Sequence, residues 1–277
     1  MRTIAEIASS LRDLDASDLH ALASDPRKGV RALVKREEKH RAAVLAESER
    51  LALMLRHERE LWQAGHVVAG VDEVGVGPLA GPVMAAAVIL PPGTSIEGID
   101  DSKQLDRNAR ESLSQTLKSV ALAWAVGSCD RQELDRMNVY QAAREAMRRA
   151  VLGLNVAPTA LLIDARTVPG VPAAQRPIVK GDQRSQSIAA ASIVAKVERD
   201  GWMRAAAERY PGYGFERHKG YYCPQHLEAL KRLGPCPLHR RSFSPVAALC
   251  NSDELESLGA EREVAATERR QEQIELF

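Results

Sequence analysis

Hydrophobic residues in the first 64 positions of the chain recur at helical spacing, as at Leu51 and Leu55. Within this stretch, glycine and proline occur only at Pro26 and Gly29. The pattern therefore predicts a helical appendage, which these two residues break into a short helical part and a long helix over about residues 30–63.

From Gly65 onward the pattern changes to short apolar runs bounded by turn residues, which are typical of buried strands. Helical periodicity returns over residues 139–152 and 186–209. Strands that alternate with helices predict an α/β fold with a mixed sheet, in which we expect the first three strands to be antiparallel neighbours. The expected strands cover residues 66–72, 83–90, 120–127, 159–164 and 178–180.

These changes of pattern divide the chain into three parts. Residues 1–65 form the helical N-terminal extension, residues 66–250 form the α/β domain with C-terminal helices, and residues 251–277 form a charged tail. We expect the tail to be a marginal helix or disordered.

Composition narrows the class of protein. Of the 277 residues, 45% are hydrophobic and 27% are charged, which excludes wholesale disorder and collagen. The chain has only four cysteines, so we expect reduced thiols and no disulfide scaffold. No apolar run approaches the roughly 18 residues of a membrane span, and aspartates interrupt the first 20 residues. We therefore expect a cytoplasmic protein without a membrane partner.

The net charge of +1 hides an uneven distribution of charge along the chain. Residues 180–250 carry 12 basic and 6 acidic side chains, whereas residues 251–277 carry 3 basic and 8 acidic ones. A basic segment of this density suits a polyanionic partner such as nucleic acid. A solvated helical surface shows the same density, so charge alone leaves both interpretations open.

Four acidic residues fall at or near the ends of predicted strands. Asp72 and Glu73 end the first strand, Asp164 ends a later one, and Asp182 follows the last strand at the start of a helix. Carboxylates from several strand ends converge at one edge of a sheet, where their oxygens suit Mg²⁺ or Mn²⁺. The alternative is structural, with Asp182 capping the helix and Asp164 starting a turn.

These acids lie inside longer motifs. The motifs are GVDEVGVGPLAGPV (70–83), DSKQL (101–105), IDA (163–165), KGDQRSQSIAAASIVAKVERD (180–200), YPGYGFERHKGY (210–221) and HRRSFSPV (239–246). In this order they resemble ribonuclease HII, the type 2 ribonuclease H, over about residues 66–247. Residues 1–65, with DPRKGV before the long helix and ERELW near its end, resemble the N-terminal extension that some bacterial members carry.

The resemblance implies a ribonuclease H-like α/β fold and an endonuclease that cuts RNA paired to DNA. It also implies cleavage on the 5′ side of single ribonucleotides embedded in duplex DNA, which leaves 5′-phosphate and 3′-hydroxyl ends. The family's four acidic positions fall on Asp72, Glu73, Asp164 and Asp182. Two divalent ions held by these acids would activate the water and stabilise the leaving oxygen, with Asp72 as the bridging ligand.

Recognition of RNA requires a contact to the 2′-hydroxyl. By the resemblance, the loop Gly75-Val76-Gly77 supplies backbone contacts there and Tyr221 packs on the neighbouring sugar. The family has arginine at the position of Val76, so this chain lacks one cation that could bind a phosphate. Tyr221 has the alternative of a buried aromatic with a structural role.

Basic and hydroxyl side chains within the motifs are candidates for phosphate contacts, because Lys, Arg and Ser make most contacts to nucleic-acid backbones. One of them, Lys196, has the alternative of a solvated or ion-paired position in mid-helix. The candidates are Lys103, Arg184, Ser185, Lys196 and Lys219.

Two cysteine–histidine pairs raise a zinc alternative, Cys223-x₂-His226 and Cys236-x₂-His239. The spacing is unusual for a zinc finger, and the prolines around the pairs favour turns. The resemblance accounts for both histidines without zinc.

The last five residues resemble the bacterial sliding-clamp-binding motif, with Gln273, Ile274, Leu276 and Phe277 as its anchors. The alternative is an ordinary tail that packs on the nuclease. Two rival functions also stay open. One is a type 3-like preference for longer RNA–DNA hybrids, and the other is a hybrid-binding protein without catalysis, which the complete set of acids opposes.

Overall fold

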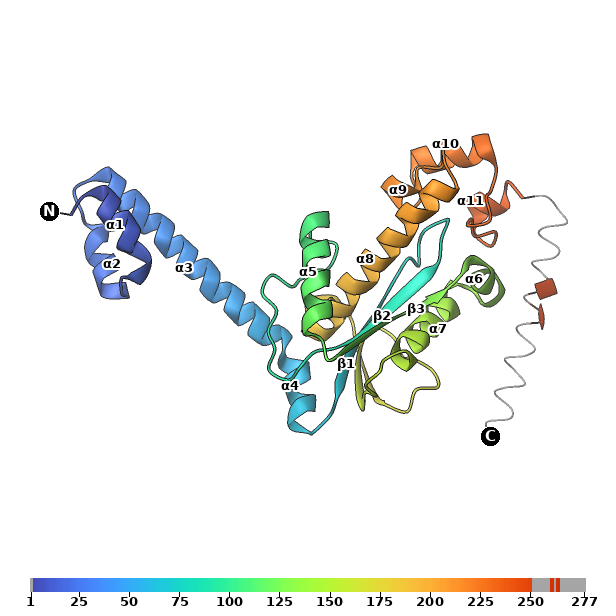
Figure 1. The fold of residues 1–277 in the computed structure, drawn as a ribbon, viewed down its shortest axis with the longest axis horizontal. Helices are drawn as coiled ribbons and strands as arrows, with labels where there is room; N and C mark the ends of the chain where they lie inside the picture. The colour runs from blue at the N-terminus through green and yellow to red at the C-terminus, as the bar shows by residue number, and fades with distance from the viewer. Residues whose placement is uncertain (1, 251–259, 262, 265–277) are drawn as a thin grey trace. The chain divides into compact units, whose positions relative to one another are not determined.

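The computed structural model describes residues 2–250, 260, 261, 263 and 264 (Figure 1). The chain divides into two compact units, Met1–Leu53 and Met54–Phe277. This division falls inside the predicted helical region, although the sequence pattern changes only at Gly65. The reason is that Leu61 and Trp62 pack against the sheet of the second unit.

The first unit consists of helices around a small apolar core formed by Ile7, Leu11, Leu19, Val30 and Val34. The predicted helix over residues 30–63 is in fact two helices with a break at Leu55. The elements up to the first strand are α1 (Ile4–Ser10), the 3₁₀ turn η1 (Leu11–Asp13), α2 (Ala16–Ala23), α3 (Lys28–Met54) and α4 (Arg56–Gln63), of which α4 belongs to the second unit.

One mixed sheet of five strands organises the second unit, in the order β3-β2-β1-β4-β5. Strands β1, β2 and β3 are antiparallel neighbours, whereas β4 is parallel to both β1 and β5. The mixed α/β fold expected from the sequence is confirmed. The strands are β1 (Val68–Val74), β2 (Val83–Ile89), β3 (Ala123–Cys129), β4 (Ala160–Asp164) and β5 (Ala174–Ile178).

Three details differ from the sequence pattern. Helices α5 (Arg107–Val120) and α6 (Arg131–Met137) were not expected, and each begins after an aspartate whose side chain caps the first turn. Strand β5 ends where the expected strand begins. It is the edge strand of the sheet, and an edge strand accommodates Pro177.

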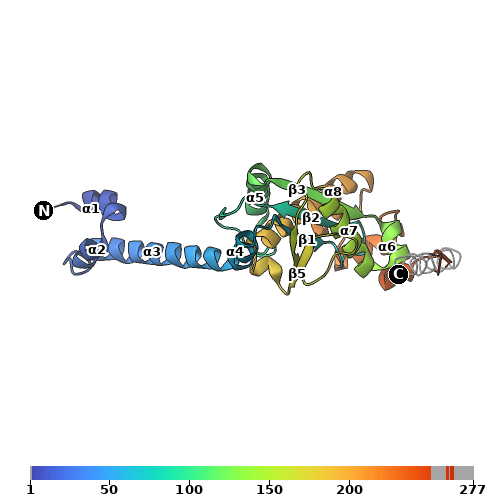
Figure 2. The same cartoon turned by 90° about the horizontal axis from the view of Figure 1, so that it is seen from below.

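Helices cover both faces of the sheet (Figures 1 and 2). Helix α7 (Val139–Leu152) packs small side chains such as Ala143 and Ala146 against β1 and β2. Helix α8 (Gln186–Arg209) packs across β1 and β2 on the other face. Because alternate strand residues point to opposite faces, each residue of β1 is directed toward one helix or the other.

The contact between α8 and β1 is unusually close at Gly70. A Cβ atom on Gly70 would lie 2.0 Å from the backbone of Ser187, the second residue of α8. Only glycine therefore allows the start of this helix to rest on the strand.

Short helices complete the described part of the second unit. They are α9 (Phe215–His218), α10 (Pro224–Leu233) and α11 (Ser244–Ala247). The rings of Tyr213 and Phe215 stack with their centroids 5.3 Å apart and pack with Met203 of α8. Among the residues that the structure describes, no helix is long and apolar enough to cross a membrane.

Candidate active site

The predicted acidic residues meet at one end of the sheet. Strands β1 and β4 pair in parallel register up to the residue before each acid, so Asp72 and Asp164 emerge side by side on one face. The Oδ1 atom of Asp164 accepts a 2.7 Å hydrogen bond from the backbone amide of Gly181. This bond ties β4 to the 3₁₀ turn η2 (Gly181–Gln183), which carries Asp182. With Glu73, these side chains form what we call the acidic cluster.

Asp72 is the most deeply buried member of the acidic cluster, with 6% of its surface exposed. Its Oδ1 atom accepts a 2.8 Å hydrogen bond from the amide of Glu73. Burial, followed by the charges of Glu73 and Asp164, raises the pKa of Asp72 well above its usual value, although a hydrogen bond from Ser192 opposes the shift. The fold thus holds Asp72 where an ionised carboxylate requires a cation.

Glu73 has one cationic partner. Its Oε1 atom lies 3.1 Å from Nη2 of Arg166, while its Oε2 atom is buried without a hydrogen-bond partner. Burial raises the pKa of Glu73, Arg166 lowers it, and the nearby charge of Asp164 raises it again. The ion pair therefore offsets only part of the cost of burying this carboxylate.

Asp182 shares a lysine with an acid that the sequence reasoning did not select. The Nζ atom of Lys103 lies 3.7 Å from Oδ2 of Asp182 and 3.7 Å from Oδ1 of Asp101. Burial, then the charge of Asp101, raises the pKa of Asp182. Although burial opposes it, the surrounding carboxylates raise the pKa of Lys103. Asp101 opens the DSKQL motif, so its place beside Lys103 was the signal that could have identified it.

The acidic cluster fits a divalent cation by the chemistry of its donors. Carboxylate oxygens are the ligands that Mg²⁺ and Mn²⁺ prefer, and the unpartnered Oε2 of Glu73 is an oxygen without a protein donor. Among the described residues, no three His, Cys, Asp or Glu side chains form a ready-made metal site. The carboxylates are instead turned toward protein donors, namely the Gly181 amide, Arg166 and Lys103.

Two buried arginines hold the loop that joins β1 to β2. Both donate to backbone carbonyls at 2.5–3.2 Å. Burial lowers the pKa of Arg199, and it lowers that of Arg240 to about 9. The accepting carbonyls are those of Ala80, Pro82 and Lys219 for Arg199, and those of Gly75, Val76 and Gly81 for Arg240.

The predicted glycine loop is shaped by this arrangement. Gly75 has a φ of +85°, and a Cβ atom there would lie 2.2 Å from Nε of Arg199. The side chain of Val76 is half-buried against the main hydrophobic cluster, whereas Gly77 is exposed. Glycine is thus required at position 75 by both conformation and space.

Lys196, Lys219 and Tyr221 lie near one another, next to the glycine loop. Lys196 forms a 2.7 Å ion pair with Asp200, and its Nζ atom lies 5.9 Å from the centre of the Tyr221 ring. Lys219 donates to the carbonyl of Glu216, and 39% of the surface of Tyr221 is exposed. The ring is therefore not buried as the structural alternative required, and the sugar contact stays a prediction.

The two remaining phosphate candidates lie at the start of α8 and differ in exposure. Arg184 is exposed and donates to the carbonyl of Val179 at 3.3 Å. Ser185 is fully buried, caps α8 through the amide of Ile188, and donates its hydroxyl to Glu58 at 2.5 Å. The Ser185 hydroxyl both donates and accepts within the protein, so its role in this structure is that of a helix cap.

The histidines of the zinc alternative form hydrogen bonds instead. Nδ1 of His239 accepts from the amide of Cys236, its Nε2 pairs with Nε2 of His226 at 3.1 Å, and Nδ1 of His226 pairs with the carbonyl of Tyr221. One neutral tautomer of each ring satisfies the whole chain of bonds. Burial lowers the pKa of His226 to about 4 and that of His239 to about 3. These rings support the Tyr221 segment rather than a metal.

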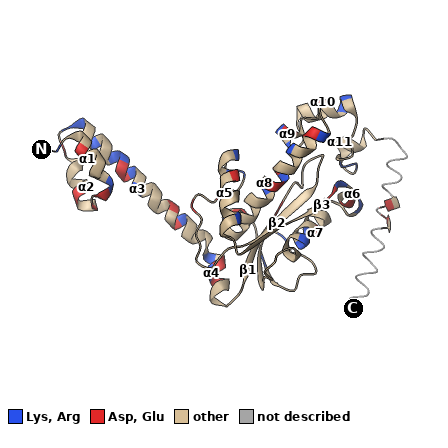
Figure 3. Ribbon diagram, in the orientation of Figure 1, with Lys and Arg blue, Asp and Glu red and all other residues tan. Residues whose placement is uncertain are grey.

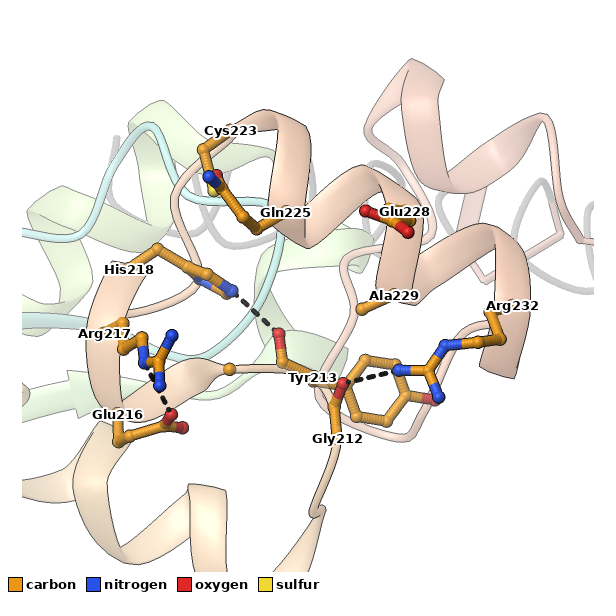
Figure 4. Close-up of a pocket in the computed structure, with 11 residues that line it drawn as sticks. Gly212, Tyr213, Glu216, Arg217, His218, Cys223, Gln225, Glu228, Ala229 and Arg232 are labelled. Atoms are coloured by element: carbon orange, nitrogen blue, oxygen red, sulfur yellow. Dashed lines mark hydrogen bonds and ion pairs between the residues drawn. The ribbon is translucent and has the colours of Figure 1, made fainter.

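A pocket of about 610 Å³ opens between α9 and α10 (Figure 4). His218 donates across one side of it to the carbonyl of Tyr213, and Arg232 donates to the carbonyl of Gly212 (Figure 4). Its lining includes Glu228 but no member of the acidic cluster. These hydrogen bonds hold the walls of the pocket together, so we assign these side chains a structural role.

Known proteins match the chain over both of its parts. The family profile described as Ribonuclease HII matches residues 69–246, and that described as Ribonuclease HII N-terminal domain matches residues 3–62. Ribonuclease HII of Myxococcus xanthus (strain DK1622) is 53% identical over 230 residues, which cover 82% of this chain and 78% of that protein. Ribonuclease HII of Geobacillus kaustophilus (strain HTA426) is 46% identical over 255 residues, which cover 91% and 98%.

Solved structures agree with the sequence matches. Ribonuclease H2 from Pyrococcus horikoshii OT3 superimposes with a TM-score of 0.57 at 27% identity, covering 66% of this chain and 96% of that one. The PCNA:RNase HII complex from Archaeoglobus fulgidus gives a TM-score of 0.50 at 25% identity, covering 60% and 87%. The sheet, the acidic cluster and these matches together show that the chain belongs to the ribonuclease HII family, the ribonuclease H endonucleases that act on RNA–DNA substrates.

Proposed function

We propose that this ribonuclease HII cuts on the 5′ side of a ribonucleotide, both in RNA–DNA hybrids and at single ribonucleotides embedded in duplex DNA. The products are 5′-phosphate and 3′-hydroxyl ends. The reaction uses two divalent cations, Mg²⁺ or Mn²⁺, held by the acidic cluster.

The observation that carries this proposal is the under-compensated charge of the acidic cluster. Asp72 is buried beside Glu73 and Asp164, and Oε2 of Glu73 has no hydrogen-bond partner. Such a cluster lowers the stability of the fold, and a bound cation offsets this loss. When bound, the cations lower the pKa of the attacking water and stabilise charge on the attacking and leaving oxygens.

The chain's own residues orient the substrate around this cluster. We assign Lys103 to a phosphate next to the scissile bond, and its Nζ atom, 3.7 Å from Oδ2 of Asp182, supports this role. Arg240 takes up the carbonyls of Gly75 and Val76, so we assign the 2′-hydroxyl contact to the amide groups of this loop. Tyr221 packs on the neighbouring sugar.

Cleavage of three matched duplexes tests the proposal. One carries a single ribonucleotide, one is a uniform RNA–DNA hybrid, and one is all DNA. We expect cuts in the first two in the presence of Mg²⁺ or Mn²⁺, with the single-ribonucleotide cut on its 5′ side, and none in the third. Cleavage of the uniform hybrid alone would instead identify a type 3-like specificity. Binding without cleavage under either metal would identify a hybrid-binding protein.

A second proposal concerns the C-terminus, whose residues Gln273, Ile274, Leu276 and Phe277 lie outside the described residues. We propose that they bind a bacterial sliding clamp, with the apolar residues as anchors in a pocket of the partner. Support comes from the motif itself and from the structural relative of Archaeoglobus fulgidus, which was solved as a PCNA:RNase HII complex.

Calorimetry with the purified clamp of the same organism tests this second proposal. We expect micromolar affinity, because few anchors must offset the cost of ordering a tail. Deletion of residues 273–277 should abolish the binding and leave cleavage of a short free duplex unchanged. Equal binding by the truncated chain, or no binding by the intact one, would favour a tail that packs on the nuclease.

A further inference from the structure

Arg166 lies immediately beyond the catalytic end of β4. The residue before it, Ala165, has a φ of +50°, a left-handed conformation that is uncommon for alanine. The amide of Ala165 donates to the carbonyl of Ile178 in β5 at 3.0 Å, which holds this turn in place. The turn directs Arg166 to Glu73, where their side chains are 21% and 12% exposed.

The ion pair between Arg166 and Glu73 is incomplete on both sides. An arginine and a carboxylate can form two parallel hydrogen bonds, but here Nη2 and Oε1 make the contact at 3.1 Å. Nη1 of Arg166 and Oε2 of Glu73 are both buried and have no hydrogen-bond partner. Buried polar atoms are rarely left in this state, so the two orphaned atoms point to ligands of opposite charge. An anion suits the guanidinium, and a cation suits the carboxylate.

The surroundings of Arg166 hold its guanidinium in one place. The group lies 5.2 Å from the centre of the Tyr140 ring, on α7, and Arg144 lies 5.7 Å from the same ring. Arg144 also donates to the carbonyl of Thr167 at 3.0 Å, which ties α7 to the segment that carries Arg166. Figure 3 shows basic residues on the ribbon of α7. A cation on an aromatic support beside the acidic cluster is pre-organised for an anionic ligand.

We propose that Arg166 is a substrate-binding residue, which donates through Nη1 to a phosphate of the bound strand while Nη2 keeps Glu73 in position. The proposal rests on the proposed function, because it takes a nucleic-acid strand as the ligand of the acidic cluster. It adds a phosphate contact from the α7 side of the sheet, apart from the predicted contacts of Arg184, before α8, and Lys196, on α8. Arginine suits this position because its fork can bind a carboxylate and a phosphate at the same time.

Binding of an all-DNA duplex at several salt concentrations tests the proposal. This duplex is not a substrate for cleavage, and a phosphate contact does not depend on the sugar, so binding is readable even if the proposed cleavage specificity is wrong. We expect Arg166→Gln to weaken binding about tenfold, as for the loss of one charge-assisted hydrogen bond. The slope of log K against log[salt] should fall by about 0.9, the value for one phosphate.

Two further variants keep the test independent of folding and of general charge. Arg166→Lys retains the charge, so it should keep the slope near that of the unmodified chain while losing part of the affinity. Arg148→Gln is the matched control, because Arg148 lies on α7 but pairs with Glu145 at 2.8 Å. It should leave the slope unchanged.

Two results would overturn the proposal. One is an unchanged salt slope in a folded Arg166→Gln protein. If that variant shifts only the metal concentration needed for half-maximal cleavage, Arg166 merely restrains Glu73. The other is an equal loss of slope in Arg148→Gln, which would assign the effect to the overall charge of α7.

Discussion

The second unit buries polar groups in two regions that differ in how completely those groups are paired. The acidic cluster places like charges together, raises the pKa of three carboxyl groups and leaves one oxygen without a partner. The other region, which we call the basic core, comprises Arg199, Arg240, His218, His226 and His239. Its side chains donate to carbonyls or pair with one another, and burial lowers each pKa.

This difference in pairing distinguishes the acidic cluster, which is the candidate active site, from the basic core, which supports the chain around it. A fully paired polar core specifies one conformation of the chain around it, here the glycine loop and the Tyr221 segment. An incompletely paired cluster costs stability until a ligand arrives. Substitutions in the two regions should therefore have opposite effects on the free energy of unfolding.

Asp72→Asn should produce the largest effect on activity and a gain in stability. Loss of the buried carboxylate should reduce cleavage at least about 1,000-fold, because in the proposed mechanism this charge holds the cations. Since the raised pKa of Asp72 means that its ionised form is costly in the fold, the neutral amide should stabilise the metal-free protein. We expect a melting temperature about 2–4 °C higher, the shift for roughly 1 kcal/mol in a domain of this size.

Cleavage assays at saturating Mg²⁺ and calorimetric melting without metal measure both effects. Asp164→Asn should also abolish cleavage. Near-normal turnover by a verified Asp72→Asn protein would remove the two-cation proposal, and a lower melting temperature would contradict the view that the cluster costs stability.

Arg240→Met should destabilise the second unit by about 3–5 kcal/mol. It leaves the carbonyls of Gly75, Val76 and Gly81 without this donor, and each unpaired buried group costs on the order of 1–3 kcal/mol. Urea unfolding measures the change. Arg176→Met is the control, since the Arg176–Glu60 ion pair is on the surface and contributes no more than about 1 kcal/mol. Equal losses in both variants would deny the basic core its structural role.

Acid should act in opposite directions on the two regions. His226 and His239 have folded pKa values of about 4 and about 3, below the usual 6.5, so the unfolded state binds more protons between these limits. The contribution of these two histidines to the free energy of unfolding is present above pH 6.5 and is lost as the pH falls toward 4. The raised pKa of Asp72 has the opposite effect on stability. The folded state takes up the proton more readily than the unfolded state, so this group stabilises the fold as the pH falls.

The comparison of pH profiles sharpens this point. Between pH 6.5 and 4, the stability of the unmodified chain should fall, and that of Asp72→Asn should fall more steeply because the opposing contribution is gone. Denaturation midpoints at half-unit pH steps supply the data. Parallel profiles would mean that Asp72 titrates alike in the folded and unfolded states.

Val76→Arg should produce the smallest effect, a change in the salt dependence of nucleic-acid binding. Position 76 lies between the acidic cluster and the basic core, whose Arg240 donates to its carbonyl. An arginine there adds one possible phosphate contact, so the salt slope of binding should rise by up to about one phosphate. The half-buried side chain at this position requires the new group to extend along the surface to reach solvent. An unchanged slope would mean that position 76 does not face the substrate.

The position of the acids was predictable because strand ends are visible in the sequence. Apolar runs that stop at Asp72 and Asp164 place both residues at one edge of any sheet that pairs these strands. The break between α3 and α4 at Leu55 was not predictable, because no glycine or proline marks it. Asp101 was missed because it belongs to a loop and ends no strand.

Ser185 illustrates what local sequence cannot decide. A hydroxyl at the start of a helix suits both a phosphate and the helix's own amides. Its partner Glu58 is 127 residues away along the chain. Long-range pairing of this kind, like the contact between Arg166 and Glu73, depends on how the elements pack and leaves no periodic signal.

The missing side chain at Gly70 has a mechanical consequence. Helix α8 rests on β1 at this point and carries Ser192 to Asp72 and Arg199 to the glycine loop, two positions about 10 Å apart along the helix axis. One close contact at Gly70 therefore sets the positions of two parts of the proposed site, Asp72 and the glycine loop, relative to each other. A methyl group at residue 70 would displace α8 and so misalign its contacts with Asp72 and with the glycine loop at the same time.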